Sequence, residues 1–281
     1  MSDYVQQHHN LSNFTGEDSW VILSDIEQSI KRKIEAAGTP LKEWDINIYR
    51  GILTGFNDAF VISTEKRDEI LASCKTDDER ERSASIIRPI LRGRDIKRYG
   101  HDWSNLWLIN THNGVKGQIP RIHIEDYPAI KAHLDMFWEK IKKRADKGDT
   151  PYNLRNCAYL EDFDKPKIIF QEIVQESQFM LDTNTHYMCN DTCRIIVGKH
   201  LDFLLRILNS ELFFYSVKTF YGGGGLGDHG VRMKHTFFGS FPCIPYDKEL
   251  EETADQSVIE SLVYTLYGLS PEEIQHIRES L

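Results

Sequence analysis

No apolar run in this 281-residue sequence approaches the roughly 20 residues that a membrane-spanning helix requires, so none is expected to cross a membrane. The extreme N-terminus holds neither a basic start nor an apolar stretch, so a secretory signal peptide is not predicted. Cysteines number five, and this odd count argues against a disulfide framework. These absences predict a soluble chain in a reducing, cytoplasmic setting.

Residues that several chemistries need are also missing. No Pro-Pro pair occurs anywhere, so the sequence lacks the Asn/Asp-Pro-Pro-aromatic turn that holds an exocyclic amine during adenine methylation. The glycine-rich stretch 221–227 follows a predicted helix instead of a strand, which is a poor context for a cofactor-binding turn. The sequence therefore predicts no cofactor-binding residue in this chain.

Metal-dependent and nucleophilic chemistry lack support as well. Asp164 and Glu172 flank a predicted strand, but the lysine of a nuclease Glu-x-Lys motif does not follow Glu172, and surface acids at strand ends are the simpler interpretation. His186, Cys189 and Cys193 are too loosely spaced for a zinc site, and both cysteines are better explained as buried small apolar residues. No serine-nucleophile signature occurs. We predict no catalytic residue and no metal ligand.

The charge is distributed unevenly. The net charge is −9, of which residues 247–281 carry −7, and this leaves −2 for residues 1–246. Within that nearly neutral body, residues 88–99 contain five bases and one acid. A basic strip on a neutral body is compatible with double-stranded DNA as a partner, although charge runs are also common on ordinary solvated faces.

Helical periodicity is clear near the N-terminus. Ser24 and Glu27 have the spacing of a capping box. Ile26, Ile30 and Ile34 repeat at helical intervals, so a helix is predicted that ends close to residue 38.

Strand and helix patterns alternate further along. We expect two strands within 46–63 around a turn at 54–57, helical structure over 64–85, 128–148 and 200–220, strands at 106–111, 167–174, 179–182, 193–197 and 231–238, and a helical pair at 254–267 and 271–280. The predicted fold class is α/β (α+β): a mixed β-sheet packed by helices, with a C-terminal helical extension. The expected domains are an N-terminal linker and helix at 1–45, a central domain at 46–246 and an acidic helical extension at 247–281.

The basic strip supplies the first group of candidate DNA-binding residues, which are Arg92, Arg94, Lys97, Arg98 and Tyr99. Arginine can donate two hydrogen bonds to a guanine edge or a phosphate, and lysine can neutralise a phosphate. Asp95 leaves a structural alternative open, in which it orients Arg94 or Arg98 within the protein.

Two further groups are candidates. Thr54 and Asn57 lie in the predicted turn, where Asn57 either pairs with adenine or holds its own turn. The segment 222–234 could close on a DNA groove, and its candidate residues are Gly223, Gly224, His229, Arg232 and Lys234. The basic stretch 142–147 either complements the end of its helix or contacts a phosphate.

An ordered set of motifs runs through most of the chain. It consists of W-V-I-L-S-D-I-E-Q-S-I-K-R-K-I-E at 20–35, R-G-I-L-T-G-F-N-D-A-F-V-I at 50–62, L-R-G-R-D-I-K-R-Y at 91–99, P-K-I-I-F-Q-E-I at 166–173, L-L-R-I-L-N-S-E-L at 204–212, F-P-C-I-P at 241–245 and L-Y-G-L-S-P-E-E-I at 266–274. In this order the motifs resemble the C-terminal specificity (target recognition) domain of TaqI-like adenine-specific DNA methyltransferases and Eco57I-like type II restriction–modification enzymes.

The resemblance implies a division of labour. In such enzymes a separate N-terminal domain binds S-adenosylmethionine and methylates an adenine that flips out of the duplex, while the specificity domain reads the DNA. The implied partners of this chain are therefore double-stranded DNA and the catalytic methyltransferase domain of the same parent protein. The implied S-adenosylmethionine site lies in that missing domain. We expect the chain to be a fragment, with a separately encoded specificity subunit as the alternative.

Two other functions stay open at this stage. The acidic helices at 247–281 could make the chain a protein-interaction module that docks a methylase or nuclease subunit. Alternatively, the glycine-rich stretch could serve as a nucleotide site of an enzyme in its own right.

Overall fold

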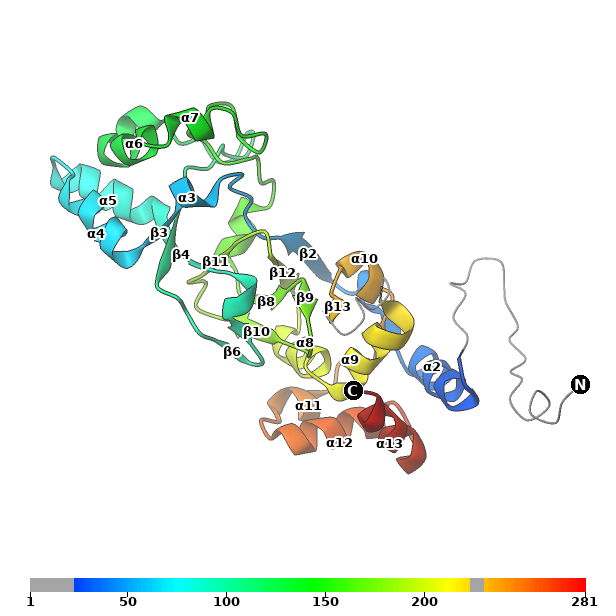
Figure 1. Cartoon of the computed structure of the whole chain (residues 1–281). Helices are drawn as coiled ribbons and strands as arrows, with labels where there is room; N and C mark the ends of the chain where they lie inside the picture. Colours follow the sequence, from blue (N-terminus) through cyan, green and yellow to red (C-terminus); the bar gives the residue numbers. More distant parts are fainter. Residues whose placement is uncertain (1–22, 223–229) are drawn as a thin grey trace, which may run out of the picture. The chain divides into compact units, whose positions relative to one another are not determined.

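The chain divides into two compact units (Figure 1). Its computed structural model describes residues 23–222 and 230–281. Unit 1 comprises Met1–Asp45, Val174–Ser177 and Asp202–Leu281, and unit 2 comprises Ile46–Ile173 and Gln178–Leu201. The predicted fold class is confirmed, because helices and mixed β-sheet occur together. The division into 1–45, 46–246 and 247–281 stays a prediction.

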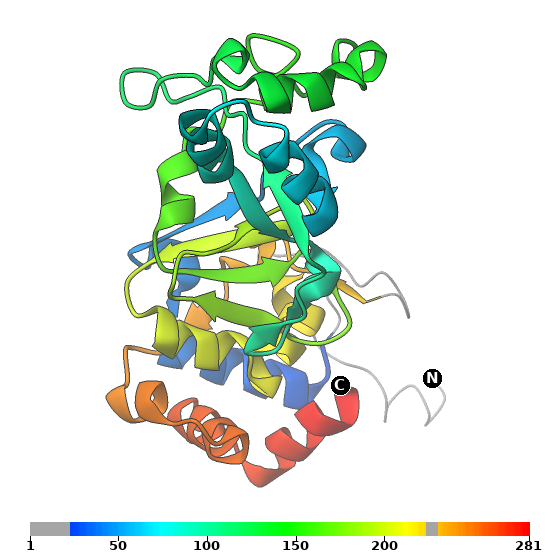
Figure 2. The ribbon, with the colours of Figure 1, turned by 90° about the vertical axis from the view of Figure 1, so that its left-hand side faces the viewer.

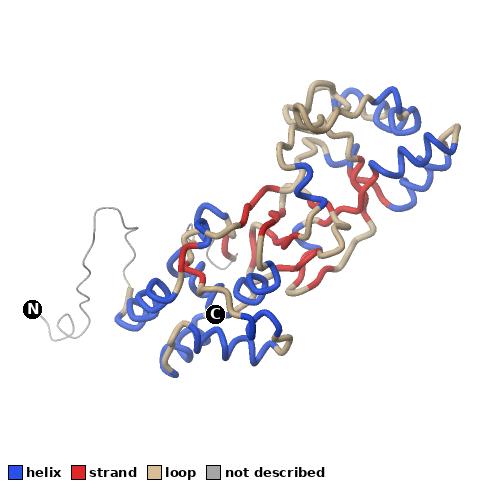
Figure 3. The backbone as a smooth tube through the Cα atoms, turned by 180° about the vertical axis from the view of Figure 1, so that it is seen from behind, coloured by secondary structure: helices blue, strands red, loops and turns tan. Residues whose placement is uncertain are grey.

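Two four-stranded sheets organise unit 2, and Figure 3 traces their strands in red. One has the order β10-β8-β12-β2, and its neighbours are antiparallel throughout. The other has the order β11-β4-β7-β3, in which β11 and β4 are parallel and the remaining pairs antiparallel. The strands are β2 Ile46–Arg50, β3 Val61–Ser63, β4 Ile87–Leu91, β7 Leu106–Ile109, β8 Lys167–Gln171, β10 Phe179–Asp182, β11 Met188–Cys189 and β12 Cys193–Gly198.

Short helices accompany these sheets. The side chains of Ser63 and Thr76 cap two of them, as the preference of hydroxyl residues for N-caps leads us to expect. Helix α4 contacts α6, and Figure 2 shows α6, in green, above the strands of unit 2. The remaining elements of unit 2 are α3 Asn57–Phe60, α4 Thr64–Ala72, α5 Asp77–Ile86, α6 Pro128–Asp135, α7 Trp138–Ile141 and the hairpin strands β5 Ile96–Lys97 and β6 Gly100–His101.

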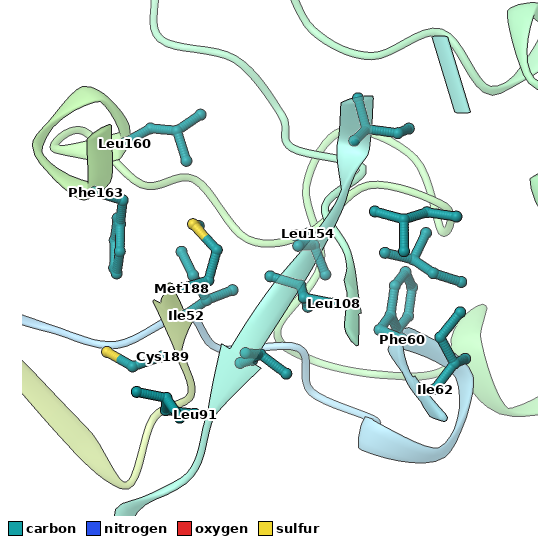
Figure 4. Close-up of a cluster of buried hydrophobic side chains, with 14 of the residues drawn as sticks. Ile52, Phe60, Ile62, Leu91, Leu108, Leu154, Leu160, Phe163, Met188 and Cys189 are labelled. Atoms are coloured by element: carbon teal, nitrogen blue, oxygen red, sulfur yellow. The ribbon is translucent and has the colours of Figure 1, made fainter. Parts of the chain in front are cut away.

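A single buried cluster connects the two sheets of unit 2. Ile169 and Ile195 join it from the first sheet, and Leu91 and Leu108 from the second. Figure 4 shows Leu91 and Leu108 together with Ile52 in this cluster. Full burial of such side chains contributes roughly 1.5–3 kcal/mol each, so the cluster is the main source of stability in unit 2.

Unit 1 is mostly helical. The predicted capping box is confirmed, because the Ser24 amide donates to the Glu27 carboxylate at 2.6 Å and the Ser24 side chain accepts from the Glu27 amide. Ile30 and Ile34 are buried on one face of that helix. Among the described residues, no helix combines the length and apolar character needed to span a bilayer. The elements are α2 Asp25–Ala37, β1 Thr39–Pro40, α8 Leu201–Leu208, α9 Glu211–Ser216, a π-helical turn Val217–Tyr221, β13 Val231–Arg232, α10 His235–Phe238, β14 Pro242–Cys243, α11 Lys248–Glu252, α12 Gln256–Leu266 and α13 Pro271–Ser280, while β9 Ile173–Val174 lies where the chain leaves unit 2.

Three local predictions were wrong in part. The two strands within 46–63 belong to different sheets, β2 to one and β3 to the other. The helix expected over 128–148 is broken into α6 and α7 and ends at Ile141. The strand expected over 231–238 covers only Val231–Arg232, and α10 begins three residues later at His235.

A buried arginine connects the loops around the 54–57 turn. Arg144 is 6% exposed, and its Nη1 donates to the carbonyls of Thr54 and of Asp146, the latter at 2.8 Å. Its Nη2 donates to the carbonyls of Pro151, at 3.1 Å, and of Asn153. Burial lowers the pKa of Arg144 to about 10, which leaves the guanidinium charged at neutral pH. This arginine therefore stabilises irregular backbone, and the phosphate-contact alternative does not apply to it.

We expect Arg144→Met to lower the free energy of unfolding by about 3 kcal/mol, because the carbonyls lose their donors and an unsatisfied buried group costs about 1–3 kcal/mol. Urea denaturation followed by tryptophan fluorescence measures the change. Lys143→Met is the matched control, since Lys143 is the exposed neighbour, and it should change stability by less than about 0.5 kcal/mol. Equal losses in the two variants would contradict the structural role of Arg144.

Candidate nucleic-acid interface

The basic strip folds into a small hairpin whose base is held by one buried carboxylate. Asp95 is 2% exposed and ends the 3-10 turn Gly93–Asp95, which precedes β5. Its Oδ2 accepts hydrogen bonds from the Arg92 amide at 2.8 Å and from Arg92 Nε at 3.1 Å. Its Oδ1 accepts from Arg92 Nη2 at 2.9 Å and from the Ser104 hydroxyl at 2.8 Å. We call Arg92, Asp95 and Ser104 the carboxylate clasp.

The clasp controls the charge state of Asp95. Burial by itself would raise the pKa of this carboxyl group, but the hydrogen bonds from Arg92 and Ser104 outweigh burial and hold the pKa below its usual value. Asp95 is therefore ionised at neutral pH and paired with Arg92. The sequence suggested that Asp95 orients Arg94 or Arg98, whereas the structure shows that it orients Arg92.

Three further cations of the strip are exposed. Arg94, Lys97 and Arg98 all lie on the surface of the hairpin. Lys97 Nζ is 3.2 Å from the Arg94 carbonyl and 3.9 Å from the carboxylate of Asp102, which is itself exposed. The Arg98 guanidinium lies 5.9 Å from the centre of the Tyr99 ring. These side chains can reach an anionic partner without disturbing buried structure.

The hairpin is fixed to the first sheet. Tyr99 has a φ of 62°, and its amide donates to the Phe179 carbonyl at 2.9 Å. The Gly93 amide donates to the Thr192 hydroxyl at 2.9 Å. The exposed cations therefore project from a support that is hydrogen-bonded at two points.

A concave surface lies beside the hairpin. It encloses about 570 Å³ and is lined by Tyr99, Gly100, His101, Met180, Leu181, Asp182, Thr183, Asn184, His186 and Tyr187. The ring Nε2 of His101 is 3.0 Å from the Tyr187 hydroxyl. Polar and aromatic groups thus gather next to the cations, which is the kind of surface that contacts base edges and backbone.

A buried ion pair shapes one wall of this surface. Lys167 is fully buried, and its Nζ lies 2.8 Å from the Asp182 carboxylate. Asp182 also accepts hydrogen bonds from the amides of His186 and Tyr187, at 3.3 and 3.0 Å. Burial would raise the pKa of Asp182, but Lys167 and these amides lower it below its usual value. This role of Lys167 is not predicted from the sequence, although a lysine at the start of the apolar strand Lys167–Gln171 is a signal of it.

The turn at 54–57 closes on itself. Thr54 is 3% exposed, and its hydroxyl donates to Asn57 Oδ1 at 2.6 Å. The Phe56 amide donates to the Thr54 hydroxyl at 3.3 Å, and Gly55 adopts a φ of 69°, which is a conformation that glycine tolerates best. The Asn57 Oδ1 therefore holds the turn, as one of the two alternatives predicted, while the side chain as a whole remains exposed. This turn packs around Arg144, whereas the basic hairpin packs on β10.

The candidates in the glycine-rich segment fall into two sets. Gly223, Gly224 and His229 lie outside the described residues. Arg232 and Lys234 are exposed in unit 1, at β13 and just after it.

Residues considered for metal chemistry are engaged elsewhere. The Asp164 carboxylate pairs with Arg88 at 2.9 Å, and the Glu172 carboxylate pairs with Arg194 at 2.6 Å. Cys189 and Cys193 are fully buried, as predicted for small apolar residues. Within 23–222 and 230–281, no group of three or more His, Cys, Asp or Glu side chains is placed to hold a metal ion.

Comparison with known proteins finds similar sequences. Residues 88–225 match the TaqI-like C-terminal specificity domain. The chain is 24% identical to the type II methyltransferase M.BstVI of Geobacillus stearothermophilus over 95% of its length and 47% of that protein. It is 23% identical to the type II methyltransferase M.PaeR7I of Pseudomonas aeruginosa, over 92% of this chain and 44% of that one. The chain thus spans about half the length of these relatives.

The fold has a known counterpart. The type IIL restriction–modification enzyme MmeI, whose structure was determined in complex with DNA, superposes with a TM-score of 0.54 at 12% identity. The match covers 86% of this chain and 32% of MmeI, and at this identity it establishes a shared fold alone. Residues 88–225 therefore match a TaqI-like C-terminal specificity domain, within a chain similar in sequence to two type II methyltransferases.

Proposed function

We propose that this chain recognises a DNA target for a restriction–modification enzyme, and that the hairpin at 92–101 is its main contact with the duplex. The observation that carries the proposal is the arrangement of Arg94, Lys97 and Arg98, which are exposed on a support fixed by the carboxylate clasp. This hairpin lies within the specificity domain. Cations on a fixed support suit a rigid polyanion better than a flexible partner.

The proposed roles follow from side-chain chemistry. Lys97 and Arg98 bind phosphates, which sets the register on the duplex, and Arg94 donates to a guanine edge. Tyr99 lines the adjacent concave surface. Arg92 supports the hairpin, because its Nε and Nη2 are bound to Asp95.

The remaining candidates have supporting roles in this proposal. Asn57 is exposed and can offer its Nδ2 to DNA, whereas Thr54 shapes the turn. Arg232 and Lys234 provide further positive charge from unit 1, and the segment that contains Gly223, Gly224 and His229 links them to the π-helical turn.

The proposal includes the rest of the enzyme. The methyl-transfer chemistry and its S-adenosylmethionine belong to a catalytic domain outside this sequence, since both relatives are methyltransferases about twice as long as the matched region. The proposed setting of this enzyme is the cytoplasm. Residues 46–246 are the target recognition domain in this scheme, flanked by 1–45 and the acidic 247–281. Part of that acidity serves the fold: Glu260 accepts from the Glu211 amide at 3.0 Å, and Glu273 pairs with Lys33 at 2.7 Å.

Salt dependence tests the hairpin contacts. We expect the triple variant Arg94→Ala, Lys97→Ala, Arg98→Ala to flatten the slope of log K against log [salt] by about two, because the two phosphate contacts of Lys97 and Arg98 are lost and each changes the slope by about 0.9. Fluorescence anisotropy with a mixed-sequence duplex measures it. The charge-matched control replaces the exposed residues Lys75, Lys116 and Lys248 with alanine, and it should leave most of the slope intact. Equal slopes for the two triple variants would refute the assignment of the hairpin.

The carboxylate clasp gives a prediction opposite to simple charge counting. Asp95→Asn adds one positive charge but weakens the bonds that fix the hairpin, so we expect DNA affinity to fall about tenfold, as for a lost charge-assisted hydrogen bond. Asp102→Asn adds the same charge on the same hairpin without touching the clasp, and it should bind DNA at least as well as the parent. Tighter binding by the Asp95 variant would contradict the role of the clasp.

The clasp also has a defined pH range. Because the folded state holds the pKa of Asp95 below its usual value of 3.8, its contribution to stability is present above that value and is lost as the pH falls through the folded pKa. We therefore expect amide exchange in 92–101 to accelerate, relative to 54–60, only below about pH 4. A transition near neutral pH would show that another group controls the hairpin.

A further inference from the structure

A second cavity in unit 2 lies at the end of β7, outside the proposed DNA-contacting hairpin. It encloses about 220 Å³ between residues 50–53, residues 110–112 and the segment 154–160. Its apolar floor is Ile52, Leu154 and Leu160, which Figure 4 shows among the buried side chains. An adjoining cavity of about 200 Å³ shares Asn110, His112 and Leu160 with it.

Asn110 is the unusual residue of this wall. It is 7% exposed, it lines both cavities, and its Oδ1 has no hydrogen-bond partner. An unsatisfied buried acceptor costs about 1–3 kcal/mol, and its side chain is not needed for the fold, because the strand is held by the Asn110 amide, which donates to the Ile86 carbonyl at 2.8 Å. A ligand that donates a hydrogen bond to Oδ1 would satisfy it.

His112 offers the complementary group. Burial lowers the pKa of His112 below its usual value, so the ring is neutral at physiological pH. Its Nδ1 accepts from the Gly114 amide at 3.2 Å, so the hydrogen of the neutral ring is on Nε2. The cavity wall therefore contains one amide acceptor and one ring N–H donor.

An aromatic wall and two exposed arginines complete the cavity. Tyr159 lines it and stacks on Tyr49 with ring centres 4.2 Å apart. Burial raises the pKa of Tyr159 to about 12, so the phenol is neutral. Arg50 and Arg155 line the cavity and are exposed, at 3.4 Å from Asp191 and 2.8 Å from Asp146 respectively.

The size of the cavity limits the ligand. Pockets for drug-sized ligands have roughly 300–1,000 Å³, so about 220 Å³ accommodates one flat ring system and not a whole S-adenosylmethionine. Gly51 defines one border, because a Cβ there would lie 1.9 Å from the Asn190 carbonyl oxygen and only glycine permits this approach.

We propose that this cavity binds a single adenine base, whose exocyclic amine donates to Asn110 Oδ1 and whose ring nitrogen accepts from His112. A single asparagine amide recognises adenine with one acceptor and one donor, and here Asn110 and His112 together supply that pair. The phosphate of the same nucleotide lies toward Arg50 and Arg155. The base comes either from a free nucleotide or from an unstacked position in DNA, and the second source rests on the proposed function.

Asn110→Leu tests the site without endangering the fold, since replacing an unsatisfied buried amide by an apolar group of similar size is neutral or stabilising. The probes are adenosine monophosphate and uridine monophosphate, measured by calorimetry on the full chain. We expect the parent to bind the adenine nucleotide at least tenfold more tightly than the uridine nucleotide. Asn110→Leu should lose this preference. Asn184→Leu changes an exposed asparagine of the concave surface beside the hairpin, and it should keep the preference.

A DNA arm distinguishes the two sources. Three duplexes are compared, one fully paired, one with a single bulged adenine and one with a bulged thymine. If the base comes from DNA, the bulged adenine binds about tenfold more tightly than the other duplexes, and Asn110→Leu removes the difference. If it comes from a free nucleotide, only the calorimetric preference depends on Asn110.

Each of the two proposals has an outcome that would refute it independently of the other. If neither the nucleotide nor the bulged duplex shows any dependence on Asn110, the adenine site does not exist. If the parent chain fails to bind even fully paired DNA, the proposed function fails, while the nucleotide arm still decides whether the cavity binds adenine.

Discussion

Burial of the Asp95 carboxylate is the constraint on which the exposed cations of the hairpin depend. An ionised carboxylate is stable in a protein interior only when it is paired and hydrogen-bonded, and Arg92 and Ser104 meet both requirements. The strip of like charge is thereby divided. Arg92 is hydrogen-bonded to the buried Asp95, whereas its neighbours Arg94 and Lys97 are exposed to solvent.

The same rule governs the other irregular segments of unit 2. Arg144 donates to loop carbonyls around the 54–57 turn, and Asp182, paired with Lys167, accepts from loop amides beside the concave surface. In each case one buried charge satisfies backbone groups that no sheet or helix reaches. A surface made of loops can then vary in its exposed side chains while its backbone keeps one shape, and a specificity domain needs this combination.

The sequence predicted most elements but few of their partners. Caps and periodicity are local, so the helix that begins after Ser24 and the strand at 179–182 were found. The separation of β2 and β3 into different sheets depends on long-range pairing, which no local pattern reports. The sequence predicted the basic strip but not the pairing of Asp95 with Arg92, because three arginines lie close enough along the chain to pair with Asp95. From the sequence, Asn110 is one more residue of a predicted strand. That its Oδ1 lacks a hydrogen-bond partner depends on the surrounding residues and cannot be predicted locally.

The discontinuity of unit 1 has a consequence for synthesis on the ribosome. Helix α2 belongs to a unit whose other helices come from residues beyond 202, and Ser29 on α2 hydrogen-bonds to Glu273, 244 positions later. At roughly 5–20 residues per second, the ribosome needs roughly 12–50 s to add that stretch. During this interval Ile30 and Ile34 have no native partner from the distal helices, while unit 2 can already fold. The nascent chain therefore carries an apolar helix face whose native contacts are complete only after residues near 273 have been synthesised.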